Sequence, residues 1–101
     1  MDKPNVLTKD EIKKELQHLP GWGFKDDKIF KEYKLPGFME ALRFVNELAP
    51  FFEAKDHHPN IHIFYSRILF ELQRFHSGDK VTSWDIEVAH EIERHFTETQ
   101  K

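Results

Sequence analysis

The chain of 101 residues contains no cysteine. This absence excludes disulfide bridges, thiolate metal sites and cysteine nucleophiles, and it fits a reducing cytoplasm. Glycine is scarce, with four residues, and no apolar run is long enough to cross a bilayer. We therefore expect a cytoplasmic protein with neither a membrane-spanning segment nor a secretory leader.

An excess of positive charge is missing as well. Fifteen basic and 18 acidic residues give a formal net charge of -3, with both signs interspersed along the chain. Direct nucleic-acid binding normally requires a basic surface, so we expect none. The chain is 39% hydrophobic and 33% charged, with ten phenylalanines, which is typical of one soluble globular domain over residues 1–101.

The first half of the chain predicts a helix followed by a hairpin. Thr8 and Glu11 have the spacing of a capping box, and apolar residues at helical spacing follow them. Alternating apolar residues then predict strands over residues 22–24 and 29–35, joined by a turn over residues 25–28. A long helix should begin near Phe38. Its predicted apolar stripe consists of Phe38, Leu42, Val45, Ala49 and Phe52.

The second half repeats this pattern of hairpin and helix. Alternation over residues 61–65 and 68–72 predicts two strands with a turn near residues 66–67. Thr82 should cap a last helix that carries Asp85 in its first turn. The predicted order is α-β-β-α-β-β-α in a single α+β domain. Hairpins imply a four-stranded antiparallel sheet with the helices packed on one face.

Two adjacent histidines beside a proline give the strongest functional signal. His57 and His58 directly precede Pro59, which fixes its own φ and disfavours helical backbone at His58. The pair should therefore lie where a helix gives way to extended chain. Imidazole, with an unperturbed pKa of roughly 6.5, can donate or accept a proton near neutral pH. Glu53 precedes His57 by one helical turn and could hold one imidazole nitrogen; alternatively, it is a solvated carboxylate at a helix end.

These residues resemble the signature of the pterin-4a-carbinolamine dehydratases. The Glu-x-x-x-His-His-Pro pattern over residues 53–59 matches that family, and Tyr65 follows Pro59 by six residues. His76 and Asp85 match a later histidine and an aspartate nine residues beyond it. The similarity extends from about Leu16 to Ile92.

The resemblance implies a chemistry and a set of roles. Family members remove water from a 4a-hydroxytetrahydropterin to give a quinonoid dihydropterin, and they need no metal or cofactor because the pterin is the substrate. His57 and His76 would be the general acid and base, and His58 would bind and orient the pterin. The resemblance also implies a homodimer or homotetramer, with a functional link to an aromatic amino acid hydroxylase through pterin recycling.

Three further residues belong to the predicted site in supporting roles. Trp22 would line the pocket or, alternatively, be an ordinary buried aromatic residue. Asp85 would hold the loop that carries His76 or, alternatively, be a stabilising charge at a helix N-terminus. Pro59 has a conformational role.

One spacing departs from the family pattern. Family members usually have nine residues between the tyrosine and the third histidine, whereas ten separate Tyr65 from His76. We place the extra residue within residues 73–75 and predict a β-bulge or an early end of the strand just before His76. A strand paired regularly through Phe75 would remove His76 from the site.

Two other functions stay open from the sequence. The first is a non-catalytic interaction module, because some animal family members are dimerisation cofactors for a homeodomain transcription factor. The second is a zinc site built from His57, His58, His62 and Glu53, although Pro59 separates His57 from His62. Histidines that converge on an open pocket would favour the enzyme.

Overall fold

A computed structural model describes residues 4–99 as a four-stranded sheet with three α-helices and one 3₁₀ turn. In chain order the elements are α1 (Lys9–Leu16), β1 (Gly23–Lys25), β2 (Lys28–Lys34), α2 (Phe38–Lys55), β3 (Asn60–Phe64), β4 (Arg67–Leu72), the 3₁₀ turn η1 (Phe75–Ser77) and α3 (Ser83–Thr99). The predicted α+β class and element order are confirmed.

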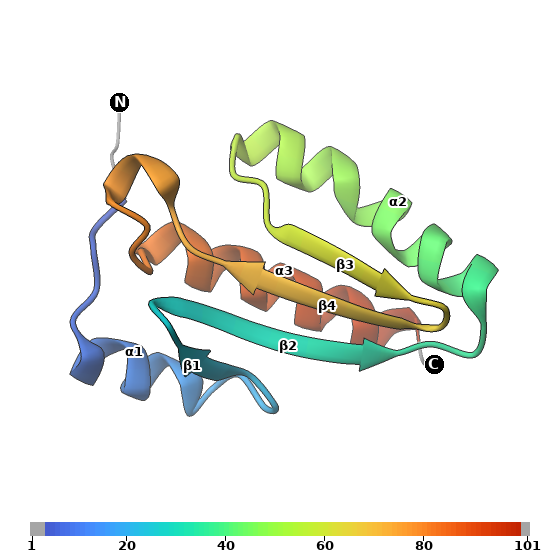
Figure 1. Cartoon of the computed structure of the whole chain (residues 1–101), viewed down its shortest axis with the longest axis horizontal. Helices are drawn as coiled ribbons and strands as arrows, with labels where there is room; N and C mark the ends of the chain where they lie inside the picture. Colours follow the sequence, from blue (N-terminus) through green and yellow to red (C-terminus); the bar gives the residue numbers. More distant parts are fainter. Residues whose placement is uncertain (1–3, 100–101) are drawn as a thin grey trace.

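The strands lie in the order β1-β2-β4-β3, and every neighbouring pair is antiparallel (Figure 1). Lys25 pairs with Lys28, which leaves Asp26 and Asp27 as a two-residue turn with φ of 54° and 59°. Left-handed backbone at both positions is what a tight hairpin needs, and aspartate tolerates it. The second hairpin turns at Tyr65, one residue earlier than predicted.

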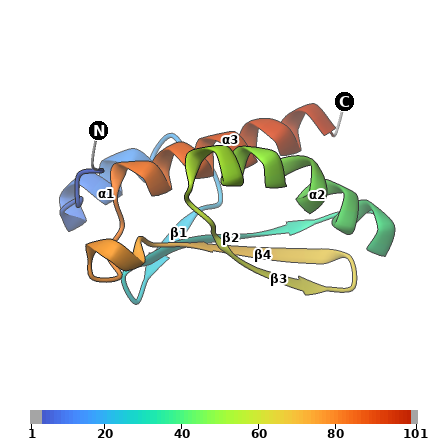
Figure 2. The same ribbon diagram turned by 90° about the horizontal axis from the view of Figure 1, so that it is seen from above.

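All three helices cover the same face of the sheet (Figure 2). Strand residues that point toward the helices are buried, and the core is continuous from the sheet to the helices. The largest fully buried side chains of β2 and β4 are Ile29, Tyr33, Ile68, Phe70 and Leu72. The alternation predicted for β2 is therefore confirmed, and it places Ile29 and Tyr33 together on the face that packs against the helices.

The predicted apolar stripe of α2 is confirmed at Phe52, but the buried face is otherwise rotated about the helix axis from the predicted one. The buried residues of α2 are Ala41, Phe44, Leu48 and Phe52. Phe38 is 45% exposed, and Ala49 is also exposed. Because α2 is apolar on more than one side, helical periodicity alone does not select the face that packs on the sheet.

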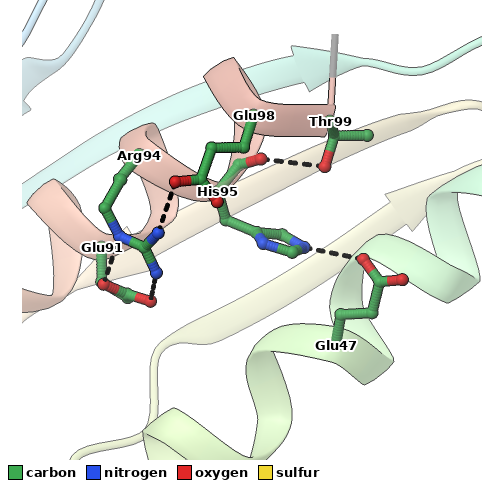
Figure 3. Close-up of polar contacts among 6 residues, drawn as sticks. All are labelled: Glu47, Glu91, Arg94, His95, Glu98 and Thr99. Carbon is green, nitrogen blue, oxygen red and sulfur yellow. Dashed lines mark hydrogen bonds and ion pairs between the residues drawn. The ribbon is translucent and has the colours of Figure 1, made fainter. Parts of the chain in front are cut away.

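Polar contacts on α3 surround its C-terminal half (Figure 3). His95 Nε2 lies 2.7 Å from Glu47 Oε1 and so joins α3 to α2. Arg94 forms ion pairs with Glu91 and Glu98 along the same helix. Exposed pairs of this kind add about 1 kcal/mol or less, so buried apolar contacts dominate the packing of the helices. Within residues 4–99, no helix is both long and apolar enough to cross a membrane.

Candidate active site

An open cavity of about 470 Å³ lies where three segments meet. The α2–β3 loop contributes His57 and His58, the turn after β4 contributes Arg74 and His76, and the start of α3 contributes Trp84. Figure 1 shows these segments at the same end of the molecule. The volume is in the range of small-molecule sites. The structure thus brings the three predicted histidines to one cavity.

The end of α2 places the histidine pair. Asp56 has a φ of 54°, a left-handed conformation that ends the helix, and the His57 amide still donates to the Phe52 carbonyl oxygen at 3.2 Å. Pro59 follows, and β3 begins at Asn60. The predicted change from helix to extended chain at the His-His-Pro sequence is confirmed.

His57 is held by a buried carboxylate. Its Nε2 atom pairs with Asp85 Oδ1, and Asp85 is completely buried. The other carboxylate oxygen, Oδ2, accepts hydrogen bonds from the Thr82 amide at 2.7 Å and the Thr82 hydroxyl at 3.0 Å. Asp85 therefore joins the first turn of α3 to the loop that carries His57.

His57 lines the cavity although only 6% of the residue is exposed. When Nε2 carries the ring proton and donates it in the hydrogen bond to Asp85, the other ring nitrogen, Nδ1, is an unprotonated acceptor.

The predicted partner of Glu53 was wrong. Glu53 Oε1 lies 2.8 Å from Nε2 of His58, not from His57. Both side chains of this pair are exposed, by 81% and 56%. Because α2 ends at Lys55, His57 does not continue the helical face on which Glu53 lies. Asp85, which we expected to hold the loop of His76, instead orients His57.

β4 ends before His76, as predicted. β4 pairs regularly with β2 as far as Leu72 opposite Ile29, and Arg74 then makes only an isolated bridge to Lys80. Residues 75–77 form η1. His76 is exposed on the cavity, and its ring centroid lies 5.5 Å from that of Phe75.

The model of one protein family, described as pterin 4 alpha carbinolamine dehydratase, matches residues 5–95. The chain belongs to this family. A relative from Sulfolobus acidocaldarius, provisionally named a pterin-4-alpha-carbinolamine dehydratase, is 35% identical over 88 residues, which are 87% of this chain and 96% of the relative. One from Koribacter versatilis with the same provisional name is 41% identical over 83% of this chain and 88% of its own.

A solved structure agrees with the dehydratase family assignment. The crystal structure of a protein from Brucella melitensis, described as a transcriptional coactivator/pterin dehydratase, superposes with a TM-score of 0.84 at 32% identity. The match covers 90% of this chain and 98% of that one. The fold and the family therefore agree along almost the whole chain.

Of the two roles that the sequence left open for Trp22, the structure supports ordinary core burial, and another tryptophan lines the cavity. Trp22 is 6% exposed in the core, with its ring centroid 6.4 Å from that of Tyr33, and it does not line the cavity. Trp84, which the sequence analysis placed only in a helix, lines the cavity with its ring centroid 6.1 Å from that of His57. Its position next to Asp85 was the signal that could have identified it.

The side chains of the alternative zinc site are not brought together. Within residues 4–99, no three His, Asp or Glu side chains are grouped as a metal site would require. His62 lies on β3, where its Nε2 is 3.1 Å from Glu71 Oε1 and its ring stacks on Phe64. Pro59 does not line the histidine cavity, and its position in the α2–β3 loop fits a conformational role.

Proposed function

We propose that the protein is a 4a-hydroxytetrahydropterin dehydratase that uses histidine acid–base catalysis. The observation that supports this most is the cavity on which His57, His58 and His76 converge. It is large enough for a fused bicyclic ring, and it presents imidazoles from two separate segments. The family assignment supplies the class of substrate.

The reaction requires two proton transfers. The bond between C4a and its hydroxyl oxygen breaks, and that oxygen takes up a proton and leaves as water. The ring nitrogen N5 loses its proton, and the released electron pair forms the C4a=N5 bond of the quinonoid product. Positioned proton transfer contributes about 10² to 10⁴-fold in rate. The dehydration written in this way needs no oxidant, reductant or metal ion.

The contacts of His57 suit the role of base. Asp85 would accept a hydrogen bond from Nε2–H, which would leave the lone pair of Nδ1 to take the N5 proton of a pterin in the cavity that His57 lines. His76, on the opposite segment of the wall, would deliver the proton to the departing hydroxyl. His58, which is paired only with the exposed Glu53, would bind and orient the ring.

Separate His57→Ala and His76→Ala substitutions test this assignment. Each should lower the rate of dehydration of a 4a-hydroxytetrahydropterin by at least roughly tenfold, a conservative reading of acid–base catalysis. His90→Ala provides the control, because His90 is exposed on α3 and does not line the cavity. Wild-type rates in both site variants would refute the proposal.

The physiological setting follows from the family and is part of the proposal. A dehydratase of this kind would recycle pterin for an aromatic amino acid hydroxylase in the cytoplasm, as a homodimer or homotetramer. Exposed apolar side chains on α2, Phe38 at 45% and Met39 at 62%, offer surface that a second subunit could cover. Sedimentation of the purified protein would test the oligomeric state.

An interaction module of the same fold is the second candidate. The Brucella melitensis structure is described as a coactivator as well as a dehydratase, and Phe38 and Met39 lie away from the histidine cavity. A chain that binds protein partners but leaves 4a-hydroxytetrahydropterin unchanged would favour this alternative.

A further inference from the structure

The Arg74 side chain is held in one orientation on the cavity wall. Its backbone amide donates to the Lys80 carbonyl oxygen at 2.8 Å, and its own carbonyl accepts from the Asp79 amide at 3.0 Å. Nη1 donates to Ser77 Oγ at 2.8 Å, and Cζ lies 5.1 Å from the centroid of the Trp84 ring. The turn thus holds the Arg74 backbone, and a hydroxyl and an aromatic face hold the guanidinium before any ligand binds.

This guanidinium has no carboxylate partner. None of the ion pairs formed among residues 4–99 includes Arg74, although its side chain is half-buried. Arginine has five N–H donors and no acceptor, and the contact with Ser77 uses only one of the donors. The remaining donors are available to an acceptor atom of a molecule in the cavity.

The charge of the cavity wall limits what that acceptor can be. Asp56, Glu71 and Asp79 line the same cavity, so with neutral imidazoles the three carboxylates and the single guanidinium give a formal charge of -2. Such a wall disfavours an anionic ligand. It favours a neutral ring that presents donors to carboxylates and an acceptor to Arg74.

A 2-amino-4-oxopteridine has such an edge: N3–H and the 2-amino group donate, and the carbonyl oxygen O4 accepts. We infer that Arg74 is a specificity-determining residue that donates to O4 and so selects 4-oxopterins against 2,4-diaminopteridines. In the diamino ring an amino group replaces O4, so that two donors would face each other at the guanidinium, and N3 carries no hydrogen for the carboxylates. This inference rests on the proposed function, because it assumes that a pterin occupies the cavity.

Calorimetric titration with two ligands tests the inference. Wild-type protein should bind 7,8-dihydropterin about 10- to 100-fold more tightly than its 2,4-diamino analogue, the fold-change that one hydrogen bond to a charged group supplies. The titration is made at mildly alkaline pH, where both ligands are neutral. In Arg74→Gln the ratio should fall about tenfold, because a carboxamide can either donate or accept, while the preference that N3–H gives through the wall carboxylates stays. Arg74→Met, which can do neither, should lower the ratio to a similar extent.

Each outcome separates the inference from the proposed function. Equal wild-type affinities, or an unchanged ratio in the variants, would overturn the role of Arg74 and leave the dehydratase proposal intact. If Arg74 had a purely structural role, its variants would bind both ligands more weakly by the same factor, and the ratio of the two affinities would again be unchanged. Wild-type protein that binds neither ligand would overturn both. Circular dichroism checks folding, and the Met variant provides the result if the Gln variant does not fold.

Discussion

Asp85 and His57 are 28 positions apart in the sequence, yet their side chains form a buried pair between Oδ1 and Nε2. The same carboxylate accepts two hydrogen bonds from Thr82 through Oδ2. A buried carboxylate is costly unless all its acceptor positions are used, and here both oxygens have partners. The start of α3 is therefore coupled directly to the orientation of one cavity histidine.

Asp85→Asn should lower kcat for dehydration by about 10- to 100-fold, the usual effect of losing a group that orients a functional histidine. The Thr82 amide and hydroxyl need an acceptor, so the Asn carbonyl oxygen should face Thr82. Its NH₂ group would then point at His57 Nε2 and force the ring proton onto Nδ1. The base would lose its lone pair toward the cavity. Steady-state kinetics over a range of pH values would measure the effect.

Glu53→Gln is the matched control for that experiment. It makes the same carboxylate-to-amide change beside His58, in a pair whose side chains are 56% and 81% exposed. Exposed pairs contribute at most about 1 kcal/mol, so kcat should change by less than about fivefold. Equal losses in the two variants would contradict the particular role of Asp85.

Trp84→Leu should weaken pterin binding, whereas Trp22→Leu should lower the stability of the fold. Trp84 lines the cavity, so its removal should weaken pterin binding by about 2- to 10-fold, which corresponds to the 0.5–1.5 kcal/mol of an aromatic pair. Trp22 is buried among core residues, so its variant should keep its affinity and lose about 1–3 kcal/mol of stability through the volume removed. Calorimetry and urea denaturation of both variants measure the two quantities. If only Trp22→Leu lost affinity for the pterin, Trp22 rather than Trp84 would be the residue that contacts the ligand.

Much of the fold could be predicted because its signals are local. The capping box between Thr8 and Glu11 is formed as the sequence indicates, and the hairpin turn falls on Asp26 and Asp27. The buried face of α2 could not be predicted, because a helix with apolar residues on several sides has more than one candidate face. The choice depends on the sheet and on α3, which lie far away in the sequence.

The site was predictable to the extent that it lies in a motif. His57, His58 and His76 could be named together because they match the signature of the dehydratase family, and the structure gathers all three at one cavity. Their carboxylate partners could not be assigned in the same way. Sequence spacing favours Glu53 for His57 because it considers only neighbours along a helix, whereas the observed contact depends on how α3 packs against the loop.

Gly78 should control the position of His76. It follows η1 with a φ of 74°, and a Cβ atom added there would meet nothing within 4 Å. The cost of Gly78→Ala is therefore backbone strain alone, about 1–2 kcal/mol for a residue forced into left-handed conformation. We expect relaxation of the turn to move His76 and lower kcat severalfold. Gly78→Asn, which tolerates this backbone better, should have the smaller effect on both kcat and thermal stability.

Tyr33 should make the protein sensitive to alkaline pH. Its hydroxyl donates to Glu93 Oε1 at 2.6 Å, and Lys31 Nζ donates to the same oxygen at 2.8 Å. Burial, together with the hydrogen bond to Glu93 and its negative charge, raises the pKa of Tyr33 well above the ordinary value of 10.0. A raised folded-state pKa means that the unfolded chain loses this proton first. The stability that Tyr33 contributes is thus complete below pH 10.0 and declines as the pH rises further.

Tyr33→Phe tests this dependence while keeping the aromatic ring that contacts Phe70 and Phe96. At neutral pH the variant should be less stable by about 1.5–3 kcal/mol, the typical contribution of a hydrogen bond to a charged group. Above pH 10.0 the difference from wild type should shrink, because only the wild-type chain has a phenol to ionise on unfolding. Urea denaturation at a series of pH values measures the difference, and parallel stability curves would show that the Tyr33–Glu93 contact does not cause the alkaline loss.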